Sequence, residues 1–276
     1  MSDDGLSIGL LLAEPAMERW ALEAVERARR DADASVDFVV LPADEDSADA
    51  DGPIDAMERY VTSALEYGAW TPVLGWHRLV NTPEHYEKVP IDDLEWIDDA
   101  EVVRARPEPA DDFGQRLPAS VVDRIESAGI DLLFRRGFGI LKGDVLTAPT
   151  HGVLSYHHGN VRDYRGRPPG VWEYANDERS AGITLQRLTP TLDGGEIVVE
   201  KTVDIGDCRT WQAVEDRLFE RSTEMLATAC TRLEDPSFET TKPDDLGPLY
   251  TCPDALETVQ IELKNSKGKL LNNISG

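Results

Sequence analysis

Two polar segments hold the side chains best suited to acid–base chemistry in this 276-residue chain. The first, SYHHGNVRDYRGRPP, runs from Ser155 to Pro169 directly after a short apolar segment. The second, LTPTLDGGEI, spans residues 188–197 and places Asp193 before two glycines, which let a backbone approach a ligand closely. A His and an Asp brought together can form a proton-transfer pair, in which the carboxylate orients or charges the imidazole. On these residues alone, a structural role for His157 is the more common outcome.

Short apolar runs separated by a helical pattern predict the framework that positions these segments. Leu6–Leu12 and Val36–Pro42 are typical of buried strands, and a helix is expected between them at about Ala16–Ala32. A strand, a helix and a strand at this spacing form a βαβ unit, which implies a parallel sheet covered by helices. Ligands collect at the carboxyl ends of such strands, where Ser155 and the loop after it would lie. We therefore expect an α/β, Rossmann-like, three-layer fold with a parallel sheet flanked by helices and a short C-terminal extension.

The rest of the chain predicts further regular elements and one irregular stretch. Residues 70–118 are punctuated by prolines and contain one short expected strand, Glu101–Arg104. Helices are also expected at 54–67 and 119–128, and Thr210 is expected to cap a long helix that continues to Leu233. The remaining strands are expected at 130–134, 152–157, 181–188 and 195–203, the last two near an edge of the sheet.

The charge balance restricts the partners and the habitat of the protein. The 28 Lys and Arg residues against 53 Asp and Glu residues give a net charge of −25, and 21 of the cations are arginine. An acid excess with arginine favoured over lysine is typical of proteins from a high-salt cytoplasm, so we expect a halophilic, cytoplasmic protein. Phosphate binding needs clustered cations and is weakened by salt, so no nucleic-acid partner is expected.

The apolar and cysteine patterns exclude other classes. No apolar run approaches the roughly 18 residues of a membrane-spanning helix, and the first residues are acidic where a signal peptide is basic. We therefore expect no contact with a membrane. The three cysteines form no CxxC pair and have no His pair nearby, so neither a disulfide framework nor a metal site is expected.

The segment GVLSYHHGNVRDYRGRPPGVW resembles the signature of the folate-dependent formyltransferases, the family that contains methionyl-tRNA formyltransferase and glycinamide ribonucleotide formyltransferase. In that family a strand ends in Asn-x-His, and Tyr-Arg-Gly and a proline follow before a helix. Alignment on the Tyr-Arg-Gly of residues 164–166 places His157 on the catalytic His. Downstream, AGITLQRLTPTLDGGEI resembles the family's Gly-Val-Thr and Leu-Asp-x-Gly motifs and places Asp193 on the catalytic Asp.

The resemblance also implies a folate pocket and a division of the chain. The segment IDLLFRRGFGILKGDVL resembles the strand and loop that line this pocket. The pterin-facing residues would be Gly137, Phe138, Gly139, Ile140 and Leu141, next to the turn at Gly194. Arg135 and Arg136 lie beside this loop, where the acidic tail of a folate would find positive charge. The catalytic domain would span residues 1–206, with 70–118 divergent, and residues 207–276 would form a C-terminal helix and extension.

One site position departs from the family pattern. The family's Asn two residues before the His donates a hydrogen bond to the oxyanion of the reaction, and Ser155 replaces it here. A serine hydroxyl can donate as well, but it is shorter than the amide. The resemblance therefore leaves His158 and Asn160 as alternative sources of the missing donor. His77 and His85, in the divergent segment, are expected to be ordinary surface residues.

The resemblance implies N-formyl transfer from 10-formyltetrahydrofolate, as co-substrate, to a small-molecule amine such as an amino sugar or a nucleotide-linked amine. His157 would stabilise the formyl oxygen together with Ser155, and Asp193 would keep the imidazole charged and accept the amine proton. The tRNA-formylating members have a basic C-terminal barrel, which the residues after 206 are too few to form. Two alternatives remain: a catalytically altered relative that binds folate or a metabolite, and hydrolysis of formyl-folate. The sequence does not predict an oligomeric state.

Overall fold

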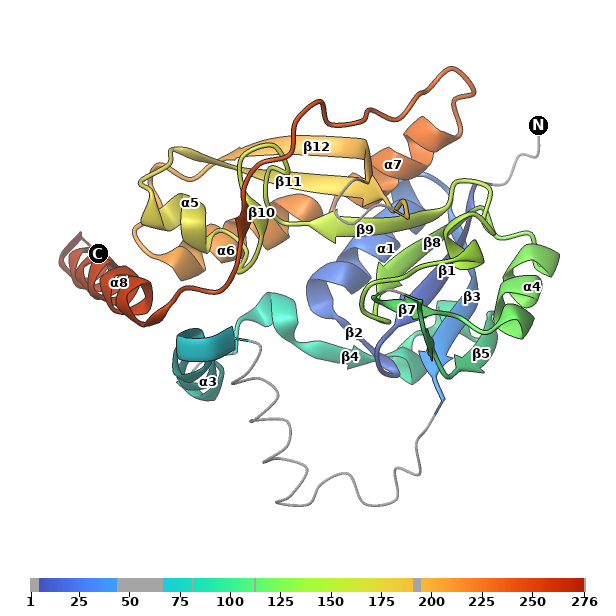
Figure 1. Cartoon of the computed structure of the whole chain (residues 1–276), viewed down its shortest axis with the longest axis horizontal. Helices are drawn as coiled ribbons and strands as arrows, with labels where there is room; N and C mark the ends of the chain where they lie inside the picture. The colour runs from blue at the N-terminus through green and yellow to red at the C-terminus, as the bar shows by residue number, and fades with distance from the viewer. Residues whose placement is uncertain (1–4, 44–66, 81, 112, 191–194, 276) are drawn as a thin grey trace, which may run out of the picture.

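The computed structural model describes residues 5–275 apart from 44–66, 81, 112 and 191–194. Seven described strands form one sheet in the order β12-β11-β9-β8-β1-β3-β5 (Figure 1). The five strands from β5 to β9 are parallel, whereas β11 is antiparallel to both of its neighbours. Their bounds are β1 Ser7–Leu12, β3 Ser35–Pro42, β5 Glu101–Ala105, β8 Leu132–Arg136, β9 Val153–His157, β11 Ser180–Arg187 and β12 Glu196–Asp204.

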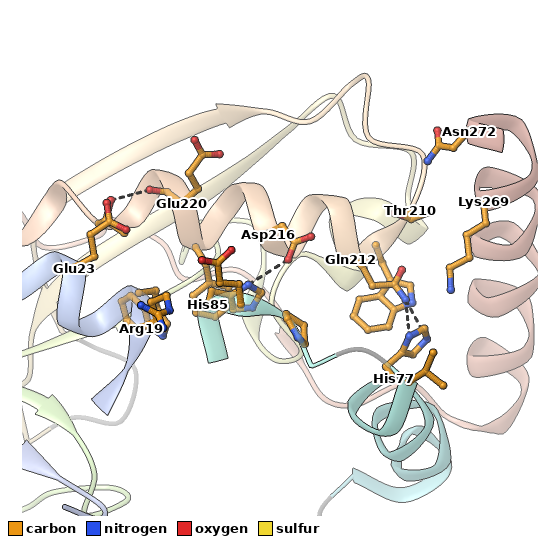
Figure 2. A pocket seen from close by; sticks show the side chains of 17 residues that line it. Arg19, Glu23, His77, His85, Thr210, Gln212, Asp216, Glu220, Lys269 and Asn272 are labelled. Carbon is orange, nitrogen blue, oxygen red and sulfur yellow. Dashed lines mark hydrogen bonds and ion pairs between the residues drawn. The ribbon is translucent and has the colours of Figure 1, made fainter. Parts of the chain in front are cut away.

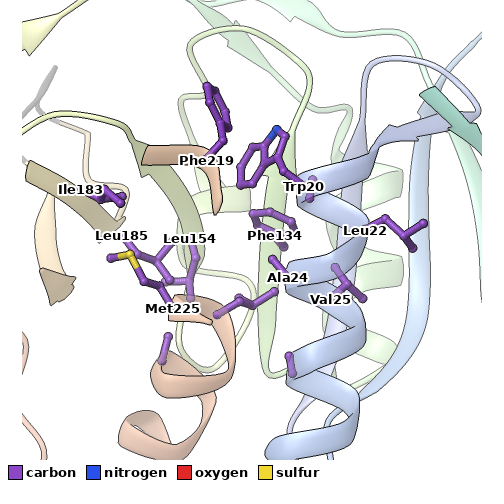
Figure 3. Close-up of a cluster of buried hydrophobic side chains, with 14 of the residues drawn as sticks. Trp20, Leu22, Ala24, Val25, Phe134, Leu154, Ile183, Leu185, Phe219 and Met225 are labelled. Atoms are coloured by element: carbon purple, nitrogen blue, oxygen red, sulfur yellow. The ribbon is translucent and has the colours of Figure 1, made fainter. Parts of the chain in front are cut away.

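Helices cover both faces of this sheet. On one face α1 (Arg19–Asp31), α6 (Trp211–Ser222) and α7 (Met225–Leu233) enclose a core that contains Phe134 and Leu154 (Figure 3). On the other face α4 (Ala119–Ser127) packs over a second core, to which neighbouring strand residues such as Leu133 and Val153 belong. Successive strand residues alternate between the two cores, as the pleat of a strand requires. The predicted α/β class and its three layers are confirmed.

The helix predicted from about Ala16 is wrong at its start. Residues Ala16–Glu18 form a short strand, β2, that pairs antiparallel with β4 (Lys88–Pro90), and α1 begins only at Arg19. The Arg19 amide donates to the Glu87 carbonyl at 2.8 Å, and the Met17 side chain is fully buried. A partner 70 residues away in sequence therefore overrides the local helical pattern.

The helix predicted from Thr210 to Leu233 is capped as expected but is interrupted. The Thr210 hydroxyl accepts from the Ala213 amide at 3.2 Å, which is the N-cap of α6. At the end of α6 the hydroxyls of Ser222 and Thr223 donate to backbone carbonyls three residues earlier, at 2.7 and 2.9 Å. Such hydroxyl-to-backbone bonds compete with helix continuation, and a second helix, α7, starts at Met225.

The C-terminal segment folds back onto this part of the chain. The helix α8 (Ala255–Ser275) docks on α6 through the buried Asn265, whose side-chain oxygen accepts from the Trp211 amide at 3.3 Å. None of the described helices is both long and apolar enough to cross a membrane. The helix expected at 54–67 lies outside the described residues except for Tyr67, and the division of the chain at residue 206 stays a prediction.

The smaller elements lie mostly in the connections. The remaining helices are α3 Thr71–Val80, α5 Val171–Ala175 and the single-turn helices η1 Gly68–Trp70, η2 Glu84–Tyr86, η3 Ile91–Asp93, η4 Glu95–Ile97 and η5 Asp144–Leu146. The remaining strands are β6 Glu108–Pro109, β7 Gln115–Arg116, β10 Arg165–Gly166 and β13 Leu249–Tyr250. Apart from α3 and the expected strand at β5, the described elements of residues 70–118 are single turns and very short strands.

A carboxyl group is buried in α5 and should make stability depend on pH. Burial raises the pKa of Glu173 to about 7, and its Oε1 is buried with no hydrogen-bond partner. Because the folded state holds this proton more tightly than the unfolded state, stability should fall as pH rises from about 4.5 to 7. Glu173→Gln should remove this loss and stabilise the protein at pH 8 by up to about 3 kcal/mol, as measured by chemical denaturation. The exposed Glu126→Gln is the control, and equal pH profiles for Glu173→Gln and wild type would contradict the assignment.

Candidate functional site

Ser155 and His157 lie where β9 separates from β8. The two strands pair only at Leu133 with Val153 and at Phe134 with Leu154. After Leu154, β9 stays paired to β11, where Ser155 lies opposite Gln186. Because side chains alternate along a strand, the side chains of Ser155 and residue 157 face the α4 side, and those of residues 156 and 158 face the α1 side.

A pocket of about 190 Å³ occupies this opening on the α4 side. Ser155 and His157 of β9 contribute to its lining, together with Gln186 of β11 and Arg135 of β8. The loop after β8 and the segments that flank residues 191–194 complete it, through Ile140, Leu141, Lys142, Leu188, Thr189, Pro190 and Gly195. The structure thus brings two of the three predicted catalytic residues into one cavity.

The imidazole of His157 is oriented by a backbone carbonyl. Its Nε2 lies 3.0 Å from the Tyr164 oxygen, and a carbonyl can only accept, so Nε2 carries a proton and donates it there. In the neutral ring this tautomer places the proton on Nε2 and the lone pair on Nδ1. Gly159 permits the arrangement, because a Cβ at this position would lie 2.6 Å from the Tyr164 oxygen and 2.7 Å from the His157 Nε2.

Asp193 and Gly194 fall in the segment 191–194, which lies outside the described residues. The residues on either side of this segment, Pro190 and Gly195, both line the pocket. The pairing of Asp193 with His157 and the contact of Gly194 with a folate stay predictions.

The predicted pterin loop is only partly in the pocket. Ile140 and Leu141 line it, and the Ile140 oxygen is held by the Gln115 amide at 2.8 Å. Gly137, Phe138 and Gly139 are not among the residues that line it, and the Phe138 side chain is buried in the α4-side core. The last two of these residues have positive φ angles, 62° and 50°, so the chain turns sharply here and directs Phe138 away from the cavity.

Neither of the alternative oxyanion donors reaches the pocket. His158 lies on the α1 side, with its Nε2 3.1 Å from the Ser222 Oγ and its ring packed against Trp20 and Phe219. Burial holds the pKa of His158 well below its usual value, so the ring is neutral at pH 7. The Asn160 side chain is used in a turn, where it donates to Asp163 at 2.6 Å and accepts from the Arg162 amide at 3.0 Å. The expectation that His158 or Asn160 supplies the missing donor is therefore wrong.

The sequence did not predict that Gln186 lines the pocket or that Arg135, expected beside the folate loop, contacts Ser155. The Arg135 Nη1 donates to the Ser155 Oγ at 3.1 Å, and its Nη2 donates to the Gly139 carbonyl. Burial, helped by the neighbouring Arg136, lowers the pKa of Arg135 to about 10, so the guanidinium stays charged at pH 7. The alternation of side chains along a strand was the feature of the sequence that indicated both positions, because Arg135 and Gln186 lie on the same face of the sheet as Ser155.

A larger cavity, of about 710 Å³, lies on the other side of β9 (Figure 2). It is bounded by α1, α6, α8 and the segment around His77 and His85, and its wall includes Trp20, which packs edge-on against Tyr156 of β9. The His85 ring stacks on Phe219 with centroids 4.3 Å apart, and its Nδ1 lies 3.2 Å from Asp216. Only 10% of the His85 side chain is exposed, so the expectation of an ordinary surface residue is wrong there. The larger cavity contains neither Ser155 nor His157, and we place the candidate site in the smaller pocket.

The family comparison matches the part of the chain that builds this pocket. The family model described as formyl transferase matches residues 101–230. Methionyl-tRNA formyltransferases are similar over part of their length. The enzyme of Geobacter metallireducens is 29% identical over a match that covers 56% of this chain and 50% of its own. The enzyme of Thermotoga neapolitana is 32% identical over a match that covers 40% of this chain and 36% of its own. The chain thus spans about half the length, or less, of these curated relatives.

Solved structures resemble the whole fold. A glycinamide ribonucleotide transformylase from Symbiobacterium toebii superimposes with a TM-score of 0.52 and 15% identity over 87% of this chain and 95% of its own. A formyltetrahydrofolate deformylase from Pseudomonas syringae gives a TM-score of 0.52 and 16% identity over 88% and 67%. At these identities the likeness establishes the fold. The chain has the α/β fold of formyl-group enzymes. The match of residues 101–230 to the formyl transferase model confirms the family resemblance inferred from the sequence.

Replacing Gly159 with Ala should displace the His157 ring. The added Cβ would collide with the Tyr164 carbonyl and with the ring, so the Nε2–H bond should be lost at a cost of roughly 1–3 kcal/mol in folding stability. Imidazole NMR signals measure this directly, because the chain has only five histidines and His157→Gln assigns the one concerned. Gly75→Ala, where a Cβ meets nothing within 4 Å, is the control. An unchanged His157 signal in folded Gly159→Ala would refute the assigned tautomer.

Proposed function

We propose that this chain is an N-formyltransferase that moves a formyl group from 10-formyltetrahydrofolate to a small-molecule amine. The observation that carries the proposal is the Ser-x-His pair of β9, which faces a pocket inside the segment matched by the formyl transferase family model. Hydrolysis of formyl-folate would use the same pocket with water as the acceptor, so the proposal is tested by following both products.

The pocket fits the flat end of a folate. Ile140, Leu141 and Leu188 give it apolar walls, and a Cβ at Gly195 would lie 2.7 Å from the Gln186 oxygen, so this glycine keeps space open. Its volume of about 190 Å³ is below the roughly 300–1,000 Å³ of pockets that enclose drug-sized ligands. The cavity would therefore hold the pterin and the reacting carbon, and the acidic tail would remain outside. The ammonium group of Lys142, which lines the pocket, would pair with the carboxylates of that tail.

When bound, 10-formyltetrahydrofolate would supply the formyl carbon that the amine attacks, and negative charge would develop on the formyl oxygen. The bond from this carbon to N10 would then break, and tetrahydrofolate would leave with a proton on N10 while the amine gives up one proton. The Ser155 hydroxyl accepts a hydrogen bond from Arg135, so its own hydrogen can be donated to a second acceptor in the pocket. The His157 ring is fixed through Nε2 and presents Nδ1 for proton exchange. In the proposed mechanism Asp193 orients or charges this ring and accepts the proton that the amine loses.

A small amine is the proposed acceptor, such as an amino sugar or a nucleotide-linked amine. The net charge of −25 opposes binding of a polyanion. In the proposed halophilic, cytoplasmic setting, high salt would weaken phosphate contacts further. These features favour a compact acceptor over tRNA.

Folate binding should raise the melting temperature. At about 100 times its Kd, the stable analogue 5-formyltetrahydrofolate should stabilise the protein by about 2.7 kcal/mol through mass action, measured by thermal denaturation in molar KCl. Gly195→Val should abolish the shift because its side chain would collide with the Gln186 side chain and the Arg187 carbonyl at the pocket wall. Gly75→Val, where a Cβ meets nothing within 4 Å, should retain the shift. No shift in the wild type at saturating analogue would count against a folate site.

His157→Gln should reduce formyl transfer by about 10²- to 10⁴-fold, because the ring nitrogen that exchanges protons is lost. Asp193→Asn should be similarly severe, while both variants should still bind the folate analogue. The measurement follows labelled formyl groups into a panel of small amines and into formate. His151→Gln is the matched control, because His151 lines a different surface depression. Equal rates for His157→Gln and wild type would rule out the proposed mechanism, and formate as the sole product would identify a hydrolase.

A further inference from the structure

The pocket contains a cation that none of the described carboxylates pairs with. Arg135 is partly buried at the end of β8, and its Nε is inaccessible to solvent and has no hydrogen-bond partner among the residues that the structure describes. Its two other nitrogens donate to neutral oxygens, the Ser155 hydroxyl and the Gly139 carbonyl. The adjacent Arg136 points to the opposite face, where it pairs with Glu18 at 3.3 Å and lies 4.5 Å from the Trp20 ring centre.

A buried guanidinium that pairs with none of the carboxylates in the described part of the chain is costly to the free protein. Buried charges are normally paired, since desolvation is not offset by hydrogen bonds to neutral groups alone. A ligand that brings negative charge to Arg135 offsets this desolvation cost. The effect on the reaction rate is largest when the negative charge develops only in the transition state. The pocket therefore favours a species with an anionic oxygen over a neutral one.

We propose, on the basis of the proposed function, that Arg135 is a catalytic residue that meets the negative charge developing on the formyl oxygen. Its guanidinium and the Ser155 hydroxyl, 3.1 Å apart, form a two-donor site that takes the place of the family's single amide donor. The position also accounts for the serine, because an amide at 155 would have to share the space that the Arg135 Nη1 occupies. His158 and Asn160 make hydrogen bonds outside the pocket, so Arg135 takes the role of the second oxyanion donor.

The decisive experiment separates chemistry from binding. Arg135→Gln should lower kcat by about 10²- to 10³-fold, the usual effect of losing one oxyanion donor, with KM for folate and amine changed less than threefold. Arg136→Gln is the matched control: it removes the neighbouring cation from the opposite face and should leave kcat within threefold. A rise in KM with unchanged kcat would show instead that Arg135 anchors an anionic part of a substrate, and it would overturn the proposal.

A rescue variant distinguishes catalysis from bracing of the loop at Gly139. Ser155→Asn in the Arg135→Gln background restores the family's amide donor and should recover at least tenfold of the lost kcat. A structural brace would not be replaced by an amide at 155. If both single and double variants are folded by circular dichroism and equally impaired, the catalytic role is refuted.

A binding measurement keeps this inference separate from the proposed function. Sodium formate, a small carboxylate that mimics the oxyanion, should shift the guanidinium ¹⁵N signal of Arg135 in the wild type, with ionic strength held constant by KCl. The Arg136 signal should stay unchanged. If the wild type transfers no formyl group, the proposed function fails and the catalytic role fails with it, yet a formate-induced shift would still support the anion site. An unshifted Arg135 signal at saturating formate would overturn the anion site even in an active enzyme.

Discussion

After Leu154, β9 is paired with β11 alone, while β8 continues beside β1 as far as Arg136. Two parallel strands that part in this way leave a space that backbone hydrogen bonds cannot close, so side chains must fill it. On the α4 side it is filled by Arg135 and Ser155, with room left for a ligand of modest size. The pocket is therefore a consequence of where strand pairing ends.

The other side of β9 explains how the polar side chains are held in place. The Tyr156 hydroxyl donates to the Ser222 carbonyl at 2.9 Å, and the His158 ring contacts the Ser222 hydroxyl at 3.1 Å. Both hydrogen bonds involve Ser222, the last residue of α6. Because α7 starts only at Met225, polar groups that a continuous helix would use for its own hydrogen bonds can bind the end of β9 instead. Trp20 packs edge-on against the same two rings. With one face anchored so firmly, Ser155 and His157 have little freedom to turn away from the pocket.

Sequence patterns predicted those parts of the fold that depend on neighbours in the chain. The apolar runs located β1, β3, β8 and β9 within a residue or two, and the Thr210 cap located the start of α6. The patterns failed where a distant partner decides the outcome. Residues 16–18 became β2 because Lys88–Pro90 lies alongside, and His85 is buried because Phe219 and Asp216 close around it. The same holds for the candidate site. The family motif located Ser155 and His157, which are close in sequence, but it did not predict the contact of Arg135 with Ser155, because that contact joins residues on two different strands.

The presence of Arg135 bears on how the proposed chemistry divides between the pocket residues. In the mechanism implied by the family resemblance, His157 must be charged, because it and a neutral amide share the stabilisation of the oxyanion. A guanidinium provides a charge that does not depend on the state of the imidazole, since its pKa of about 10 keeps it protonated at neutral pH. If Arg135 meets the oxyanion, His157 would be able to accept the amine proton, with Nε2 held by the Tyr164 carbonyl. The carboxylate of Asp193 would then be needed to orient this ring and to stabilise the imidazolium after proton transfer, and no longer to charge it beforehand. If both proposals hold, the serine in place of the family's asparagine would go with a site whose positive charge is permanent, and the histidine would share the role of base with Asp193.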